Sequence, residues 1–221
     1  MHRSNRFVAI MRMGDGREVT AHVANSGRLE ELLTPDNPML MAKAPDGTGR
    51  KTEYDLVLVE TDGVLVSADA RLPNTLVREA IGDGRIPELL GYEHVASEVT
   101  FDDSRLDIVL SGSPGLCYVE VKSVTLVENG AGLFPDAPTE RGRKHVTALL
   151  KAAGQGHRAA AVFVIQRPDV EAFSPNWEAD PRFCETLQES AERGVEVYAY
   201  RCSVSRTSIE ISDPVPVMLE S

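Results

Sequence analysis

The chain has 221 residues, of which 42% are hydrophobic and 26% are charged, a composition typical of a globular protein with one large or two small domains. Its formal net charge of -11 excludes a protein that binds nucleic acid over most of its surface, so any such contact has to be local. No apolar run approaches about 18 residues, which excludes a membrane-spanning helix, and the short polar stretch 1–6 lacks the pattern of a signal peptide.

The first third of the chain is predicted to form a small β-domain. Apolar and polar residues alternate with a period of two, which predicts strands, and turns such as Gly14-Asp15-Gly16 separate them. The expected strands cover residues 6–12, 17–23, 38–43, 54–60 and 64–67, with one helical turn at 29–33. So many short strands in so short a segment indicate a small closed barrel. An OB-like barrel over residues 1–69 is our main interpretation, and an SH3-like barrel is the alternative.

The turn Asn25-Ser26-Gly27-Arg28 in this segment has two interpretations. It is typical of a helix N-cap, where Asn or Ser caps the helix and Gly permits the bend. Alternatively, Arg28 and the backbone N–H groups of the turn bind a phosphate. OB domains that bind oligonucleotides use aromatic side chains as stacking platforms. The segment offers only Phe7 and Tyr54, which fit core positions equally well.

The remainder, residues 70–221, is predicted to be a mixed α/β domain. A helix begins near Pro73, ends at Gly82, and precedes three strands arranged as a meander. Helices at 139–153 and 181–192 then alternate with buried strands at 159–165 and 195–200, and a last strand or hairpin arm covers 202–211. This order predicts a mixed sheet with helices on both faces.

Charged residues interrupt the second and third strands of this meander. Asp107 lies near the start of one strand, and Glu120 and Lys122 lie two residues apart near the end of the next, so the latter two share a face. If the strands are neighbours, Asp107 joins them. Two carboxylates beside an ammonium suit a site that holds a hard divalent cation at a phosphate. The alternative is solvated strand positions with a weak ion pair, although residues 117–121 otherwise have the pattern of a buried strand.

The predicted helix at 139–153 carries a local excess of positive charge. Over residues 139–151, four basic residues stand against one acid in a chain of net charge -11. The basic residues are Arg141, Arg143, Lys144 and Lys151, and the acid is Glu140. This helix either presents a solvated face whose charges pair with acids elsewhere or binds phosphates.

The three cysteines are scattered among apolar residues at positions 117, 184 and 202. Their odd number and the lack of a CxxC pair favour buried free thiols over disulfides or a thiolate zinc site. Free thiols are typical of a reducing compartment, so we expect a cytoplasmic protein.

These features together resemble the sugar fermentation stimulation protein A (SfsA) family over nearly the whole chain. The segments that carry the resemblance are RFVAIM, HVANSGRLEELL, LPNTLVREAI, IPELLGYE, VFVIQRPD and VEVYAYRC. The most specific segment is YVEVKSVTLVENGAGLFPDAPTERGRKHV. The resemblance implies an OB-like domain joined to a PD-(D/E)XK nuclease-like domain, DNA binding, and a regulatory link to sugar metabolism.

Two groups of residues are singled out under this resemblance. The nuclease-type D…ExK motif, with a further acid from the preceding helix, falls on Glu79, Asp107, Glu120 and Lys122. The expected nucleic-acid-binding positions are Asn25, Gly27, Arg28, Arg141, Arg143, Lys144 and His145.

We rank DNA binding with a regulatory role first and nuclease activity second. In a nuclease, Mg²⁺ or Mn²⁺ would be held by Glu79, Asp107 and Glu120 and would activate water at a phosphodiester. Lys122 would orient that water or stabilise the developing charge, and Gln166, at the end of the strand 159–165, would position a phosphate or a metal-bound water. A binding module for a nucleotide or an acidic partner is a third interpretation. The expected partners are DNA and, as an alternative to a monomer, a second copy of the chain, with no membrane.

Overall fold

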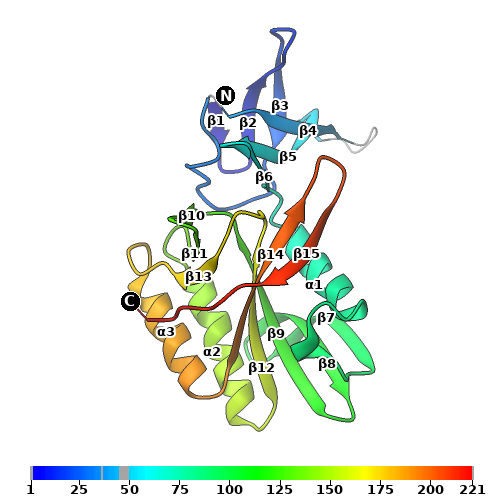
Figure 1. Ribbon diagram of the computed structural model, residues 1–221, viewed down its shortest axis with the longest axis vertical. Helices are drawn as coiled ribbons and strands as arrows, with labels where there is room; N and C mark the ends of the chain where they lie inside the picture. The colour runs from blue at the N-terminus through cyan, green and yellow to red at the C-terminus, as the bar shows by residue number, and fades with distance from the viewer. Residues whose placement is uncertain (1, 36, 45–49, 221) are drawn as a thin grey trace.

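The computed structural model describes residues 2–35, 37–44 and 50–220, which form two domains stacked along the long axis of the molecule (Figure 1). The first domain contains β1 (His2–Asn5), β2 (Val8–Arg12), β3 (Glu18–His22), β4 (Met39–Lys43), β5 (Tyr54–Thr61) and β6 (Val64–Ser67). The second begins with α1 (Leu72–Gly82), the short 3₁₀ helix η1 (Pro87–Leu89), β7 (His94–Phe101), β8 (Ser104–Gly112) and β9 (Gly115–Val124). It continues with β10 (Val127–Glu128), β11 (Ala131–Phe134), α2 (Glu140–Gly154), β12 (Arg158–Ile165), β13 (Ala172–Pro175), α3 (Pro181–Glu192), β14 (Glu196–Val204) and β15 (Ile209–Pro214).

The sheet of the first domain has the strand order β1-β2-β3-β5-β4, with β6 paired to β5. Alternation turns Ala9 and Met11 of β2 toward the same core as Val19 and Ala21 of β3. This is the small β-domain expected from the sequence, with two differences. Strand pairing among the described residues does not close the sheet into a barrel. The structure also contains β1, a strand that was not predicted because its sequence HRSN lacks apolar alternation.

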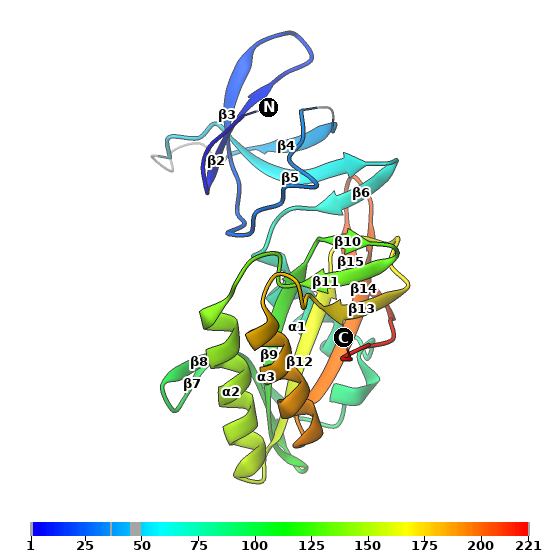
Figure 2. The ribbon, with the colours of Figure 1, turned by 90° about the vertical axis from the view of Figure 1, so that its left-hand side faces the viewer.

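The second domain is built on a mixed sheet with the strand order β15-β14-β12-β9-β8-β7. Strands β7, β8 and β9 form the predicted antiparallel meander, whereas β9, β12 and β14 run parallel to one another. Helices α2 and α3 cover one face of the sheet and α1 covers the other (Figure 2). The predicted mixed sheet flanked by helices is therefore confirmed.

Strand β12 explains why both faces need helices. Its residues 159–165 are all buried, and alternate side chains enter two separate cores. Phe163 packs in the core under α2 and α3, while Val162 and Val164 pack in the core under α1. A continuous apolar run of this kind is stable only when covered on both sides.

One segment expected to be a loop contains a strand. Within residues 129–138, β11 pairs in parallel with β13 and antiparallel with β10, and the three form a small second sheet. Backbone pairing with β10 and β13 makes this segment a strand, although its sequence is too rich in Gly and Pro to show a strand pattern. Among the described residues, no helix combines the length and apolar character needed to cross a membrane.

Candidate functional site

Asp107 and Glu120 occupy opposite positions on neighbouring strands. The register of β8 against β9 pairs Ile108 with Val119, so the next position along sets Asp107 against Glu120. Asp107 Oδ2 accepts from the backbone N–H of Val121, the residue between Glu120 and Lys122, so its carboxylate lies close to both. Lys122 lies on the same face of β9 as Glu120, two residues further along the strand. The structure therefore brings the three predicted side chains together.

The Glu120 carboxylate is buried, and its two oxygens have different surroundings. Lys122 Nζ and His145 Nδ1 both contact its Oε1. Its Oε2 is buried as well and has no hydrogen-bond partner among the described residues. A buried carboxylate oxygen without a donor is unfavourable unless something positive faces it. This oxygen is therefore the feature of the site that most needs an explanation.

Helix α1 contributes Asn74 to the site, and not Glu79. Asn74 Nδ2 donates to Asp107 Oδ1 over 2.9 Å, and the backbone N–H of Val121 donates to Asp107 Oδ2, also over 2.9 Å. Glu79 is exposed on α1, whose buried face packs on the sheet. No group of three His, Cys, Asp or Glu side chains that could hold a metal ion occurs among the described residues. The structure thus does not bring Glu79 to the carboxylate pair, contrary to the expectation for a further acid.

Burial and charge shift the two carboxyl groups in opposite directions. Burial, followed by the charge of Glu120, raises the pKa of Asp107 above its usual range. Burial also opposes ionisation of Glu120, but Lys122 and His145 outweigh it and lower the pKa of that carboxyl. Glu120 is therefore the member of the pair that is held in its charged form, and Asp107 is the member that takes up a proton first as the pH falls.

The donor set fits a hard divalent cation. Mg²⁺, Mn²⁺ and Ca²⁺ prefer oxygen ligands, and the unpartnered Glu120 Oε2 offers one opposite Asp107. With two carboxylates at hand, water and substrate oxygens would complete the coordination, as is usual for Mg²⁺. A positive ion there would also relieve the repulsion that raises the pKa of Asp107.

Most of the basic residues of α2 are engaged within the second domain. Three of them form ion pairs with acids of other elements: Arg143 with Asp180, Lys144 with Asp103, and Lys151 with Asp102. The solvated-face interpretation therefore describes Lys144 and Lys151, while Arg143 is half-buried and ties α2 to the start of α3. Arg141 alone among the basic residues of α2 has no ion pair within the part of the chain that the structure describes.

His145 also differs from its expected nucleic-acid-binding role. It is buried on the inner face of α2, where it contacts Glu120. It is therefore a partner of the carboxylate site and cannot reach a ligand on the outer face of the helix.

The turn at residues 25–28 connects the two domains. Asn25 Oδ1 accepts a hydrogen bond of 2.8 Å from the N–H of Gly27, and Asn25 Nδ2 donates to Ala68 O over 3.2 Å. The N–H of Arg28 donates to Asp136 Oδ2 of the second domain over 2.6 Å. The helix N-cap interpretation is wrong in part, because a hydrogen-bonded turn follows in place of a helix. The phosphate-binding interpretation is limited too, because the Asp136 carboxylate already accepts from the N–H of Arg28. The Arg28 side chain is exposed.

Gly27→Ala is expected to lower the free energy of unfolding by about 1–3 kcal/mol, measured by urea denaturation. A Cβ at Gly27 would lie 2.4 Å from Asp136 Oδ2, so the carboxylate would have to leave the Arg28 N–H. Ser26→Ala in the same turn is the control and should stay within about 0.5 kcal/mol of the wild type, because Ser26 is exposed. Equal stability of the two variants would show that Asp136 does not hold the turn.

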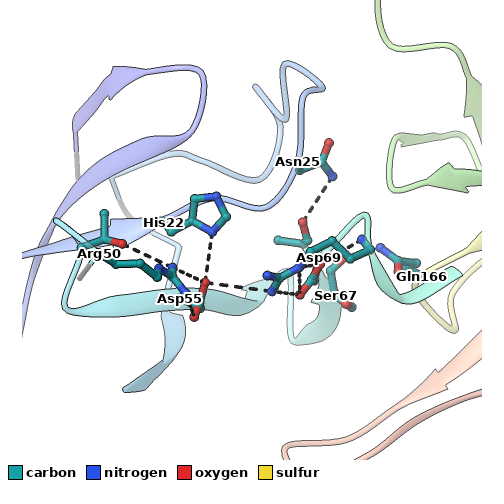
Figure 3. A network of polar contacts seen from close by, with 10 residues as sticks. His22, Asn25, Arg50, Asp55, Ser67, Asp69 and Gln166 are labelled. Carbon is teal, nitrogen blue, oxygen red and sulfur yellow. Dashed lines mark hydrogen bonds and ion pairs between the residues drawn. The ribbon is translucent and has the colours of Figure 1, made fainter. Parts of the chain in front are cut away.

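Gln166, expected in the catalytic site, lies at the junction of the domains. Its Nε2 donates to Ser67 O over 2.9 Å, and the N–H of Ser67 donates to Gln166 O over 3.0 Å. Figure 3 shows this side chain beside Ser67, next to a polar network that includes Asp55 and Asp69. Lys122 pairs with the third residue before Gln166 on β12, which places them about 10 Å apart along the sheet. Gln166 thus positions the first domain and does not reach the carboxylates.

Two family models match most of the chain. One, described as "SfsA N-terminal OB domain", matches residues 1–68, and the other, described as "Sugar fermentation stimulation protein RE domain", matches residues 71–208. The chain belongs to the sugar fermentation stimulation protein family. The resemblance seen in the sequence and the OB-like nature of the first domain are thereby confirmed.

Relatives in this family are similar over nearly their whole length. A sugar fermentation stimulation protein homolog from Desulforamulus reducens is 45% identical over 219 residues, which is 99% of this chain and 90% of the relative. A homolog from Citrifermentans bemidjiense is 44% identical over 220 residues, 99% of this chain and 95% of the relative. The structure of Pyrococcus furiosus SfsA in complex with Ca²⁺ is similar with a TM-score of 0.90 at 33% identity, covering 99% of this chain and 93% of the other.

A cleft of about 380 Å³ separates the two domains of this family member. Arg6 lines it from the first domain, and Arg141 lines it from α2. Ser123, the neighbour of Lys122 on β9, also lines it, so the cleft reaches the strand that carries the carboxylate site. Two guanidinium groups from different domains therefore line the cleft, whereas Asp107, Glu120 and Lys122 are not among its lining residues, and no sequence pattern marked Arg6 for this position.

Proposed function

We propose that this protein binds DNA in the cleft between its domains and hydrolyses a phosphodiester bond with a divalent cation held by Asp107 and Glu120. The observation that carries the proposal is the buried, unpartnered Glu120 Oε2, opposite Asp107 and beside the Lys122 ammonium. The Pyrococcus furiosus relative was solved in complex with Ca²⁺, which supports a divalent cation as the ligand.

The residues around this cation would have different roles in the reaction. A bound cation supplies Lewis acidity to the phosphate and lowers the pKa of coordinated water. Lys122 places a fixed positive charge where negative charge develops on the phosphate oxygens. His145 and Asn74 are positioning residues, since each contacts one of the two carboxylates and fixes its orientation.

Cleavage of linear and supercoiled DNA in Mg²⁺ or Mn²⁺ tests the proposal, with Lys122→Met as the decisive variant. The wild type is expected to cut, and Lys122→Met is expected to be at least about 100-fold slower, the effect of losing one group that stabilises transition-state charge. Lys151→Met is the matched control and should cut at the wild-type rate, because Lys151 pairs with Asp102 at the exposed end of α2. A wild-type protein that binds DNA and cuts it in neither metal would contradict hydrolysis.

DNA binding without turnover, in a regulatory role, is the second candidate function. It is favoured by the contacts of Glu120, because a buried carboxylate that is paired with Lys122 and hydrogen-bonded to His145 also occurs as a purely structural feature. Under this candidate, Arg141→Ala weakens DNA binding and Asp107→Asn leaves it unchanged. The affinity of both proteins for DNA falls with added salt.

A further inference from the structure

Phe7 is an exposed aromatic side chain at the edge of the first domain. It lies in the turn between β1 and β2 with 47% of its surface exposed. Tyr54, the other aromatic residue of this domain, packs against the domain core. The structure therefore separates two residues that the sequence left equivalent, because much of the Phe7 ring faces solvent whereas Tyr54 packs against the core.

The turn that carries Phe7 is held firmly next to the cleft. The N–H of Val23 donates to Phe7 O over 2.9 Å. The Arg3 guanidinium donates to the carbonyl oxygens of Gly27 and Arg28 over 3.0 and 2.6 Å, and it also contacts that of Arg6. One guanidinium thus joins the β1–β2 turn to residues 25–28, so the Phe7 ring sits on a fixed backbone. Its sequence neighbour lines the cleft.

The positive charge available at the cleft is small and concentrated. Arg6 and Arg141 line it without an ion pair among the described residues, and the acids Asp136 and Glu140 line it as well. Burial, and then the nearby charge of Arg6, lower the pKa of Arg3, as expected where two guanidinium groups adjoin. An extended duplex is typically gripped by about 6–10 phosphate contacts. The α2 surface cannot supply them, because most of its basic side chains are already paired.

We infer that the nucleic acid taken by this cleft is single-stranded, with one base stacked on Phe7 and adjoining phosphates on Arg6 and Arg141. The inference rests on the proposed function and specifies its substrate class. Stacking on an aromatic ring accepts any unpaired base, and it supplies affinity without further positive charge. A base inside a duplex offers no free face to Phe7.

Binding of fluorescein-labelled dT12 and of the dT12·dA12 duplex, followed by fluorescence anisotropy in EDTA, tests the inference without cleavage. The wild type is expected to bind dT12 at least about 10-fold more tightly than the duplex. Phe7→Ala should weaken dT12 binding by about 5- to 150-fold, the range for loss of one stacked base, and Phe7→Trp should retain it. Leu90→Ala is the matched control, because Leu90 is equally exposed, at 46%, but lies after η1 in the second domain.

The outcomes separate this inference from the proposed function. If the duplex binds as tightly as dT12 and Phe7→Ala changes neither affinity, while Arg141→Ala weakens both, the single-strand inference is overturned and DNA binding stands. If the wild type binds neither probe at low salt, the proposed function fails and the inference fails with it.

Discussion

Glu120→Ala is expected to lower the free energy of unfolding by about 3–5 kcal/mol, the usual result of removing one partner from a buried charge pair. The Lys122 and His145 side chains that contact this carboxylate are only 13% and 8% exposed. Without Glu120, Lys122 would lose its buried counter-charge and His145 would lose its hydrogen-bond partner. Urea unfolding followed by circular dichroism measures the loss as a lower midpoint at an unchanged slope.

The control for this prediction separates charge from packing. Glu120→Gln keeps the volume and one hydrogen-bonding oxygen, so its loss of stability should lie between those of the wild type and Glu120→Ala. Lys122→Met should cost less than Glu120→Ala, because His145 still contacts the remaining carboxylate. If Glu120→Ala is as stable as the wild type, the ion pair contributes nothing and the buried site is not formed as described.

The pH dependence of the Glu120 effect has a definite sign. The pKa of this carboxyl is lowered in the folded protein, so the stability it contributes is fully present above the ordinary pKa of a glutamate, about 4.3. That contribution is lost as the pH falls through the lowered, folded-state pKa. The difference between wild type and Glu120→Ala should therefore be large at neutral pH and shrink in acid.

The carboxylate pair could be predicted because its geometry is local. The two-residue period of a strand sets Glu120 beside Lys122, and a short turn sets the strand of Asp107 next to theirs. The buried strand β12 could be predicted equally well, because an unbroken apolar run of this length is typical of a strand that is covered on both faces. In both cases the information lies within one strand or one hairpin.

The helical periodicity of the sequence distinguishes His145 from the basic patch on α2. The buried residues Gly142, Val146 and Leu149 are spaced three and four apart, and His145 falls on that same inner face of α2. Periodicity of the helix therefore separates it from Arg141 and Lys144, which are exposed.

Other site residues depend on how distant segments meet, which no local pattern encodes. The N–H of Arg28 binds Asp136, which lies 108 residues further along the chain. Gln166 donates a hydrogen bond to Ser67, 99 residues before it, so the end of β12 contacts the first domain and not a ligand. A sequence places each of these residues at a turn or a strand end, but the partner comes from domain packing.

A divalent cation is expected to raise the thermal midpoint of the wild-type protein, and Asp107→Asn is expected to abolish the rise. At a free concentration of Ca²⁺ or Mg²⁺ about 100 times the dissociation constant, binding to the folded state adds about 2.7 kcal/mol. For a chain of this size that corresponds to a rise of roughly 5–10 °C in a calorimetric scan. Glu79→Gln is the control and should keep the full rise, because Glu79 is exposed on α1 and away from the carboxylate pair.

Without a cation, Asp107→Asn should be at least as stable as the wild type at neutral pH. Burial and the charge of Glu120 raise the pKa of Asp107 in the folded protein. The folded state therefore binds a proton more tightly than the unfolded state, and wild-type stability in EDTA falls as the pH rises from about 3.9 through the folded-state pKa. Asparagine removes that penalty, so the gap between the two proteins should open over the same pH range.

The two halves of the Asp107 prediction test different things. A cation-induced rise that persists in Asp107→Asn would place the ion elsewhere in the protein and contradict the proposed metal site. A variant that is less stable than the wild type in EDTA at neutral pH would show that the hydrogen bonds from Asn74 and Val121 outweigh the electrostatic penalty on Asp107. The expected combination, with the cation effect lost and stability kept or gained, is typical of a residue placed for ligand binding at the expense of stability.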